Sequence, residues 1–158
     1  MNDEVVLRLA EIDDAAKIIQ LLQQVKQETS YLVLDPTTLT IEKEQELIAR
    51  YANHPCALMV VAETAGEIIG ILTLLPLATS EQYKVELGVC VLAAYWGQGI
   101  GSNLMEVGLD FAAHSDIECI ELEVVKDNRA AIRLYEKFDF VKVTEQANTI
   151  QMTYSVKK

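Results

Sequence analysis

The sequence predicts an α/β protein built on one mixed, mainly antiparallel sheet with helices on both faces. Three apolar, strand-like segments follow one another in the middle of the chain, which favours antiparallel pairing. A later strand–helix–strand unit between Val85 and Val125 favours one parallel pair joined by a crossover helix. The chain has 158 residues, 51% of them hydrophobic, so we expect residues 1–158 to form a single domain around one core.

The first half of the chain predicts a strand, two helices and a hairpin, in that order. The strand is expected where residues alternate in character. Each helix follows a candidate N-cap, Asp13 or Asp14 for the first and Thr38 or Thr40 for the second. After Pro55 the pattern changes to two apolar runs around a polar turn. The expected positions are Val5–Leu9 for the strand, Ile18, Leu22 and Val25 for the first helix, Ile41, Leu47, Ile48 and Tyr51 for the second, and Ala57–Glu63 and Ile68–Leu75 for the hairpin.

The second half predicts two strand–helix units followed by two closing strands. The third strand of the central series leads into a glycine turn at Gly97–Gly101 and then into an amphipathic helix. Glutamates alternate with apolar residues in the next strand, and Asn128 is a good N-cap for the last helix. The expected positions are Val85–Leu92, the helix face Ile100, Leu104, Val107 and Phe111, the strand residues Ile120, Leu122 and Val124, the helix residues Ala131, Leu134, Tyr135 and Phe138, and the strands Val141–Val143 and Thr149–Val156.

Composition excludes several classes of protein. The net charge of −11 and the lack of a basic stripe argue against a nucleic-acid partner. No segment approaches the roughly 18–20 apolar residues of a membrane span, and the acidic N-terminus does not resemble a secretory signal. Cys56, Cys90 and Cys119 have no paired spacing, which argues against disulfides and a metal site. We therefore expect a cytoplasmic protein, whose acidity either attracts a cationic substrate such as an amine or serves solubility alone.

The glycine turn predicts an anion site. Gly97, Gly99 and Gly101 leave the backbone open to a ligand between a strand and the start of a helix, whose unpaired N–H groups suit a pyrophosphate. A Walker A loop would need a Lys after its last glycine, and none is present. A dinucleotide fingerprint would place its third small residue at Ser102, but it would open the sheet rather than follow several antiparallel strands.

The segment Trp96–Gly101 resembles the Arg/Gln-x-x-Gly-x-Gly/Ala motif of the GNAT superfamily of N-acetyltransferases, with Trp96 at the first position. A second segment, Val125–Phe140, resembles the family's Asn, Ala and Tyr-Glu-x-x-Gly-Phe pattern, with Asp139 in place of the Gly. A residue after a helix end often adopts a left-handed backbone, which Asp tolerates less well than Gly. The two motifs together are specific, and the resemblance extends over essentially the whole chain.

The resemblance implies the GNAT acyl-CoA N-acyltransferase fold, with acetyl-CoA as cosubstrate, no metal, and an amine acceptor on a small molecule or a protein. A homodimer is a further expectation, since dimers are common for such folds. A non-catalytic acyl-CoA sensor is the alternative, which the departures at Trp96 and Asp139 keep open. The residues implied to bind the coenzyme are Val89, Val91, Gly97, Gln98, Gly99, Ile100, Gly101, Ser102, Asn128 and Tyr135.

Acetyl transfer needs a free amine, donors for an oxyanion and an acid for the leaving thiolate. By resemblance, Tyr135 is the acid, although spacing alone also suits a core aromatic. Glu86 corresponds to a Glu that acts through water in many relatives, and Glu123 on the next strand is the alternative base. Backbone N–H groups near Val89–Val91 are the expected oxyanion donors. A covalent route through Cys90 has no evident base partner in the sequence.

Overall fold

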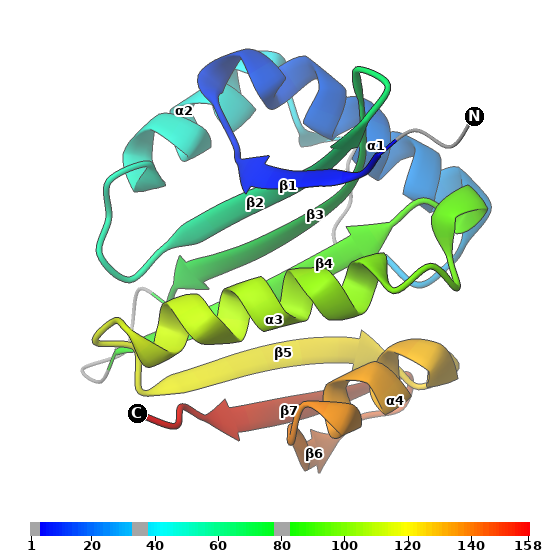
Figure 1. The fold of residues 1–158 in the computed structure, drawn as a ribbon. Coiled ribbons are helices and arrows are strands. Elements are labelled where there is room, and N and C mark those ends of the chain that lie inside the picture. The colour runs from blue at the N-terminus through cyan, green and yellow to red at the C-terminus, as the bar shows by residue number, and fades with distance from the viewer. Residues whose placement is uncertain (1–3, 33–37, 78–82) are drawn as a thin grey trace.

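The computed structural model describes residues 4–32, 38–77 and 83–158, which form a seven-stranded sheet flanked by helices (Figure 1). Within these ranges the helices and strands follow the predicted order. The helices are α1 (Ala15–Glu28), α2 (Ile41–Tyr51), α3 (Ile100–Ala113) and α4 (Arg129–Lys137), with short 3₁₀ turns η1 (Ile12–Asp14) and η3 (Ala93–Tyr95). The strands are β1 (Val6–Leu9), β2 (Leu58–Thr64), β3 (Glu67–Pro76), β4 (Lys84–Val91), β5 (Cys119–Val125), β6 (Val141–Glu145) and β7 (Thr149–Ser155).

The sheet is mixed, as the sequence predicts. Its strand order is β1-β2-β3-β4-β5-β7-β6, and β4 with β5 forms the parallel pair while the other neighbours are antiparallel. The closing hairpin folds back so that β7, not β6, pairs with β5 along Cys119–Val125. The sequence does not predict this strand order, because the residues of a hairpin do not determine which of its two strands pairs with the rest of the sheet.

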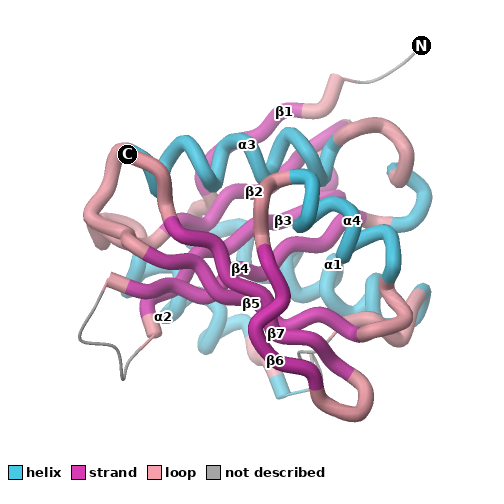
Figure 2. The backbone as a smooth tube through the Cα atoms, turned by 90° about the horizontal axis from the view of Figure 1, so that it is seen from below, coloured by secondary structure: helices cyan, strands magenta, loops and turns pink. Residues whose placement is uncertain are grey.

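Two apolar layers cover the two faces of the sheet. One layer, here called the α3-side core, joins residues such as Leu104, Met105 and Ile120 with Tyr135. The other, the α1-side core, joins Ile18, Leu22 and Ile48 to the opposite face of β2 and β3. Figures 1 and 2 show α3 and α4 on one side of the sheet and α1 and α2 on the other. A break in the sheet would therefore bring a ligand into contact with both layers.

Two local predictions are wrong in detail. Val107 was expected on the buried face of α3, but it is 37% exposed, and Met105, Gly108 and Ala112 are buried instead. Asp14 is the N-cap of α1, yet its carboxylate makes no cap hydrogen bond there. Both oxygens of Asp14 instead accept from the Arg8 guanidinium, each at 2.8 Å, which ties β1 to the start of α1.

The other caps form as expected. The Thr40 hydroxyl accepts from the backbone N–H of Lys43 at 3.1 Å, and the Asn128 side chain accepts from that of Ala131 at 3.2 Å. Asp139 has a left-handed backbone with φ of 71°, as its place after α4 predicts, and Lys157 pairs with its carboxylate at 2.7 Å. In the described part of the chain, no helix is long and apolar enough to cross a membrane.

Candidate active site

The sheet opens between its two parallel strands. Pairing of β4 with β5 ends at Glu86 and Glu121, although both strands continue for several residues. β4 stays paired with β3 as far as Val91, and β5 stays paired with β7 as far as Val125. Figure 1 shows β4 and β5 diverging toward their C-terminal ends. Leu87–Val91 of β4 therefore faces a gap instead of a neighbouring strand.

The edge of β4 along this gap carries peptide groups that have no partner on β5. Alternate residues of a strand direct their N–H and C=O groups to opposite edges. Leu92 donates its N–H to the Ile69 carbonyl of β3 at 2.9 Å, so the peptide groups of Val91 and Val89 point toward the gap. The indole N–H of Trp96 donates to the Val91 carbonyl at 2.8 Å, from the gap side. The N–H groups of Val89 and Val91, which the sequence analysis expects to act as donors, therefore point into the gap.

The glycine turn lies at the end of this edge. Its three glycines differ in backbone conformation and in the space around them. Gly97 and Gly99 both have φ of +79°, a left-handed backbone that a side chain would strain. An added Cβ at either position would meet nothing within 4 Å. Gly101 lies inside the first turn of α3, where a Cβ would make ordinary contact with Leu134 at 3.5 Å. Open backbone is therefore a property of the first two glycines rather than of all three.

Two helices begin at the same place. The first N–H groups of α3, at Ile100 to Ser102, have no partner within their own helix, and the same holds for the first turn of α4. The Asn128 side chain caps α4, so residues 127–131 present the start of that helix beside the start of α3. Helix N-termini carry partial positive charge. Both therefore favour an anionic group between them.

A pocket of about 660 Å³ joins these features. Its walls come from the gap edge of β4, the glycine turn with the start of α3, the start and inner face of α4, and the end of α1. The residues that line it, among those described, are Val25, Thr29, Tyr31, Leu32, Val89, Cys90, Val91, Tyr95, Trp96, Gly97, Gly99, Ile100, Gly101, Ser102, Asp127, Asn128, Arg129, Ala130, Ala131, Leu134 and Tyr135. Since Val25 and Leu32 belong to the α1-side core and Tyr135 to the α3-side core, the pocket connects the two faces of the sheet.

Tyr135 and Cys90 both line the pocket and are neighbours. Tyr135 is 6% exposed, and its ring packs on Phe140 with centroids 5.9 Å apart. Burial and the neighbouring Cys90 thiol raise the pKa of Tyr135, so the phenol stays protonated at neutral pH. Burial also raises the pKa of the Cys90 thiol to about 12. In the described part of the chain the Tyr135 hydroxyl has no hydrogen-bond partner, and it remains available to a ligand.

The two candidate bases lie outside the pocket lining. Glu86 is exposed and stands on the same face of β4 as Cys90, four residues or roughly 13 Å earlier along the strand. Glu123 is half-buried on β5, opposite Gln151 of β7, and no residue of β5 lines the pocket. Direct contact of either carboxylate with a ligand in the pocket is therefore not supported by this geometry.

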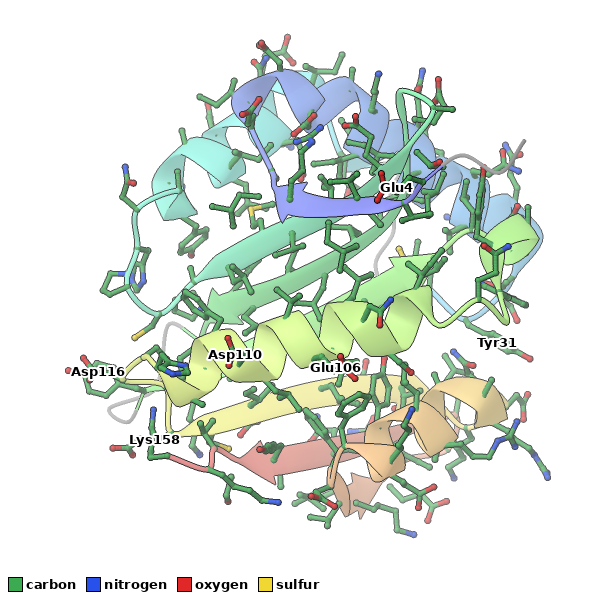
Figure 3. All side chains as sticks on the ribbon, viewed as in Figure 1. Glu4, Tyr31, Glu106, Asp110, Asp116 and Lys158 are labelled. Carbon is green, nitrogen blue, oxygen red and sulfur yellow. The ribbon has the colours of Figure 1, made fainter. Side chains whose placement is uncertain are left out.

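The sequence analysis missed the contribution of α1 and its C-terminal extension. Val25, Tyr31 and Leu32 line the pocket, and Figure 3 shows Tyr31 at the margin of the molecule near the turn that follows β4. A local signal exists for this geometry, because the Thr29 hydroxyl accepts the Tyr31 N–H at 3.2 Å and so orders the turn. Gln98, an expected coenzyme contact, is not among the described residues that line the pocket. No three His, Cys, Asp or Glu residues among those described are close enough to hold a metal.

Comparison with known proteins identifies the family. The model of the "Acetyltransferase (GNAT) family" matches residues 20–140. An L-amino acid N-acetyltransferase of Escherichia coli is 27% identical over 139 residues, which cover 87% of this chain and 83% of that protein. A mycothiol acetyltransferase of Acidimicrobium ferrooxidans is 48% identical over 44 residues, or 28% of this chain, but the match spans only 14% of that longer protein.

Solved structures agree with the fold. An acetyltransferase of the GNAT family from Streptococcus pneumoniae superposes with a TM-score of 0.89 at 26% identity, covering 98% of this chain and 100% of that one. An acetyltransferase structure from Salmonella typhimurium, solved with acetyl-CoA, gives a TM-score of 0.83 at 18% identity, covering 98% and 95%. The chain belongs to the GNAT family and has its fold, and it is an N-acetyltransferase.

Proposed function

We propose that the protein transfers an acetyl group from acetyl-CoA to a primary amine by direct attack of the amine on the thioester. The observation that carries the proposal is the gap between β4 and β5, which joins an anion site at two helix starts to the buried Tyr135 hydroxyl through one continuous pocket. One pocket thus offers a place for the phosphates, the thioester and an incoming nucleophile. The name of the Escherichia coli relative, an L-amino acid N-acetyltransferase, supports an amine acceptor.

In this proposal the coenzyme follows the edge of β4. Its pyrophosphate would accept from the free N–H groups at the start of α3, with Gly97 and Gly99 leaving the approach open. The pantetheine arm, which carries amide groups, would run beside the N–H groups of Val89 and Val91, which point into the gap. The thioester then lies near Cys90 and Tyr135. Asn128 supports the site by capping α4, whose inner face holds Tyr135.

The proposed reaction forms an amide bond and breaks the thioester bond. The amine nitrogen attacks the thioester carbonyl carbon, and the oxyanion that forms accepts from a fixed N–H of the β4 edge. The carbon–sulfur bond then breaks, the acetyl group stays on nitrogen as an amide, and the thiolate takes a proton from the Tyr135 hydroxyl, which regains one from the water that received the amine proton. The raised pKa of Cys90 supports direct attack, because a thiol kept neutral at pH 7 is a poor nucleophile for a covalent route.

Removal of the amine proton is proposed to pass through water. Glu86 is the proposed base, with Glu123 as the alternative, and both would act at a distance because neither lines the pocket. Bulk water alone can serve for an amine whose pKa is near neutrality. The dependence of turnover on pH in Glu86 variants separates these routes.

Binding and turnover can be measured separately. Trp96 is the chain's single tryptophan, it is 55% exposed, and it lines the pocket, so coenzyme A should change its fluorescence. Acetyl-CoA with a panel of amines should release free thiol and form one amide per thiol. Coenzyme binding without thiol release would oppose the proposed reaction, and a protein that ignores coenzyme A but responds to NAD would overturn the proposal entirely.

A further inference from the structure

The pocket extends beyond the position proposed for the thioester. The phosphate end is marked by the starts of α3 and α4, and the thioester end by Tyr135 and Cys90. On the α1 side of the sheet, where Cys90 also lies, the pocket is lined by Val25, Thr29, Tyr31 and Leu32. If acetyl-CoA binds as proposed, the acceptor is the reactant left to fill this region, which we call the α1 arm.

The α1 arm is apolar in the residues described. Val25 is 6% exposed and belongs to the α1-side core, and Leu32 packs against the same core. Tyr31 adds an aromatic ring, which Figure 3 places at the margin of the molecule. The Thr29 hydroxyl is already engaged, since it donates to the Val25 carbonyl and accepts the Tyr31 N–H. The arm thus offers apolar surface and one phenol.

Among the described residues, the charged side chains near the pocket lie outside the α1 arm. Asp127 and Arg129 line the pocket at the start of α4, on the phosphate side. Glu28, at the end of α1, accepts the Ala93 N–H at 3.0 Å with one oxygen and the Gln24 amide at 3.2 Å with the other. Its carboxylate therefore holds α1 to the turn after β4. A second ammonium on the acceptor would find no free carboxylate among the described residues of the arm.

Among the described residues, none that line the α1 arm is a carboxylate, and the proposed base, Glu86, would act only through water, which restricts the choice of amine. At pH 7, an α-amino group of pKa about 7.8 has roughly 300 times more free amine than a lysine-type group of pKa about 10.4. An apolar arm further disfavours the ammonium form, because burial penalises the charge. An amine of lower pKa, such as an α-amino group, therefore suits this site better than a lysine-type amine.

We propose that the acceptor is an α-amine attached to a bulky apolar side chain and carrying no second positive charge, and that Val25, Tyr31 and Leu32 bind that side chain. The inference rests on the proposed function, since it assigns the part of the pocket that acetyl-CoA leaves open. It narrows the acceptor from any primary amine to one chemical class. Polyamines and lysine side chains are excluded from the preferred substrates.

Five amines test this specificity with acetyl-CoA at pH 7: L-phenylalaninamide, L-leucinamide, glycinamide, cadaverine and spermidine. The first three share an α-amine beside a neutral amide and differ in the apolar side chain. Full burial of such a side chain predicts a kcat/KM roughly ten- to a hundredfold higher for phenylalaninamide and leucinamide than for glycinamide. Equal rates for the three amides, or a preference for cadaverine or spermidine, would overturn the inference.

Variants of Tyr31 locate the effect. Tyr31→Ala should remove most of the preference for phenylalaninamide over glycinamide, with KM for acetyl-CoA unchanged, whereas Tyr31→Phe should keep it. Tyr83→Ala is the matched control, because Tyr83 is 56% exposed and lies outside the pocket lining. Unchanged selectivity in Tyr31→Ala would refute the assignment of the arm. Failure to bind coenzyme A would instead refute the proposed function, so the two failures are distinguishable.

Discussion

Replacing Gly99 by Ala separates backbone strain from coenzyme binding. Gly99 has φ of +79°, and a Cβ there would meet no atom within 4 Å, so the cost to the free protein is strain alone. A left-handed residue with a side chain costs roughly 1–2 kcal/mol. For a domain of this size each kcal/mol lowers the Tm by roughly 2–4 °C, which gives a fall of about 2–8 °C.

Gly66 provides a matched control for that substitution. It has φ of +80°, also has nothing within 4 Å of an added Cβ, and lies in the hairpin between β2 and β3, outside the pocket lining. Gly66→Ala should therefore lower the Tm of the free protein by the same amount as Gly99→Ala. The two variants should differ only when coenzyme A is present.

Thermal unfolding with and without coenzyme A is the assay. A ligand at a hundred times its Kd stabilises the folded state by about 2.7 kcal/mol, so wild type and Gly66→Ala should gain roughly 5–10 °C. In Gly99→Ala the Cβ occupies space beside the turn, and a hundredfold weaker Kd would reduce the stabilisation to about 0.4 kcal/mol. If Gly99→Ala keeps the full ligand-induced shift, the phosphates do not bind at this turn.

Three further substitutions test the site and its support. Tyr135→Phe keeps the ring packing and should lower kcat by about 10²–10⁴-fold with little change in coenzyme affinity; near-normal turnover would remove the phenol from the mechanism. Glu86→Gln should lower kcat/KM at neutral pH and recover at higher pH, where free amine is plentiful; an unchanged pH profile would point to Glu123 or to water. Asp14→Asn breaks a bidentate pair with Arg8 and should cost about 1.5–3 kcal/mol in urea unfolding at pH 7. Because the Arg8 guanidinium lowers the pKa of Asp14, this stabilisation exists above the ordinary aspartate pKa and disappears as the pH falls through the lowered value. The difference between wild type and Asp14→Asn should therefore shrink in acid, and a constant difference would contradict the ion pair as its cause.

Features governed by neighbouring residues could be predicted from the sequence. Thr40 and Asn128 cap helices through hydrogen bonds that span three residues, and the alternation of Ile120, Leu122 and Val124 places all three in the core. The left-handed turn at Gly97 is likewise a local property. Each follows from the backbone geometry of a short segment, so a single sequence suffices to predict it.

Features set by long-range pairing could not be predicted in the same way. The gap at the candidate site exists because β4 and β5 stop pairing at Glu86 and Glu121, a matter of register between segments 35 residues apart. The contribution of Tyr31 depends on where α1 packs against the sheet. Glu86 occupies the expected strand, yet its side chain lies outside the pocket lining because the gap opens only after it. The family resemblance supplied the walls of the pocket from β4, α3 and α4 but not the wall from the end of α1 and residues 29–32.

The surroundings of Cys90 indicate how Tyr135 can act as an acid despite a raised pKa. In water, transfer of a proton from a phenol of pKa about 10 to a thiolate of pKa about 8.5 is uphill by about 2 kcal/mol. Burial raises the pKa of the Cys90 thiol to about 12, because the thiolate loses its hydration there. A coenzyme thiolate released beside Cys90 would lose hydration in the same way and become a stronger base. Burial raises the pKa of Tyr135 as well, so donor and acceptor shift in the same direction and the difference between them stays close to that in water. The apolar pocket that makes Cys90 a poor nucleophile thus raises the pKa of a nearby thiolate along with that of Tyr135, so the cost of the proposed proton transfer stays near its value in water.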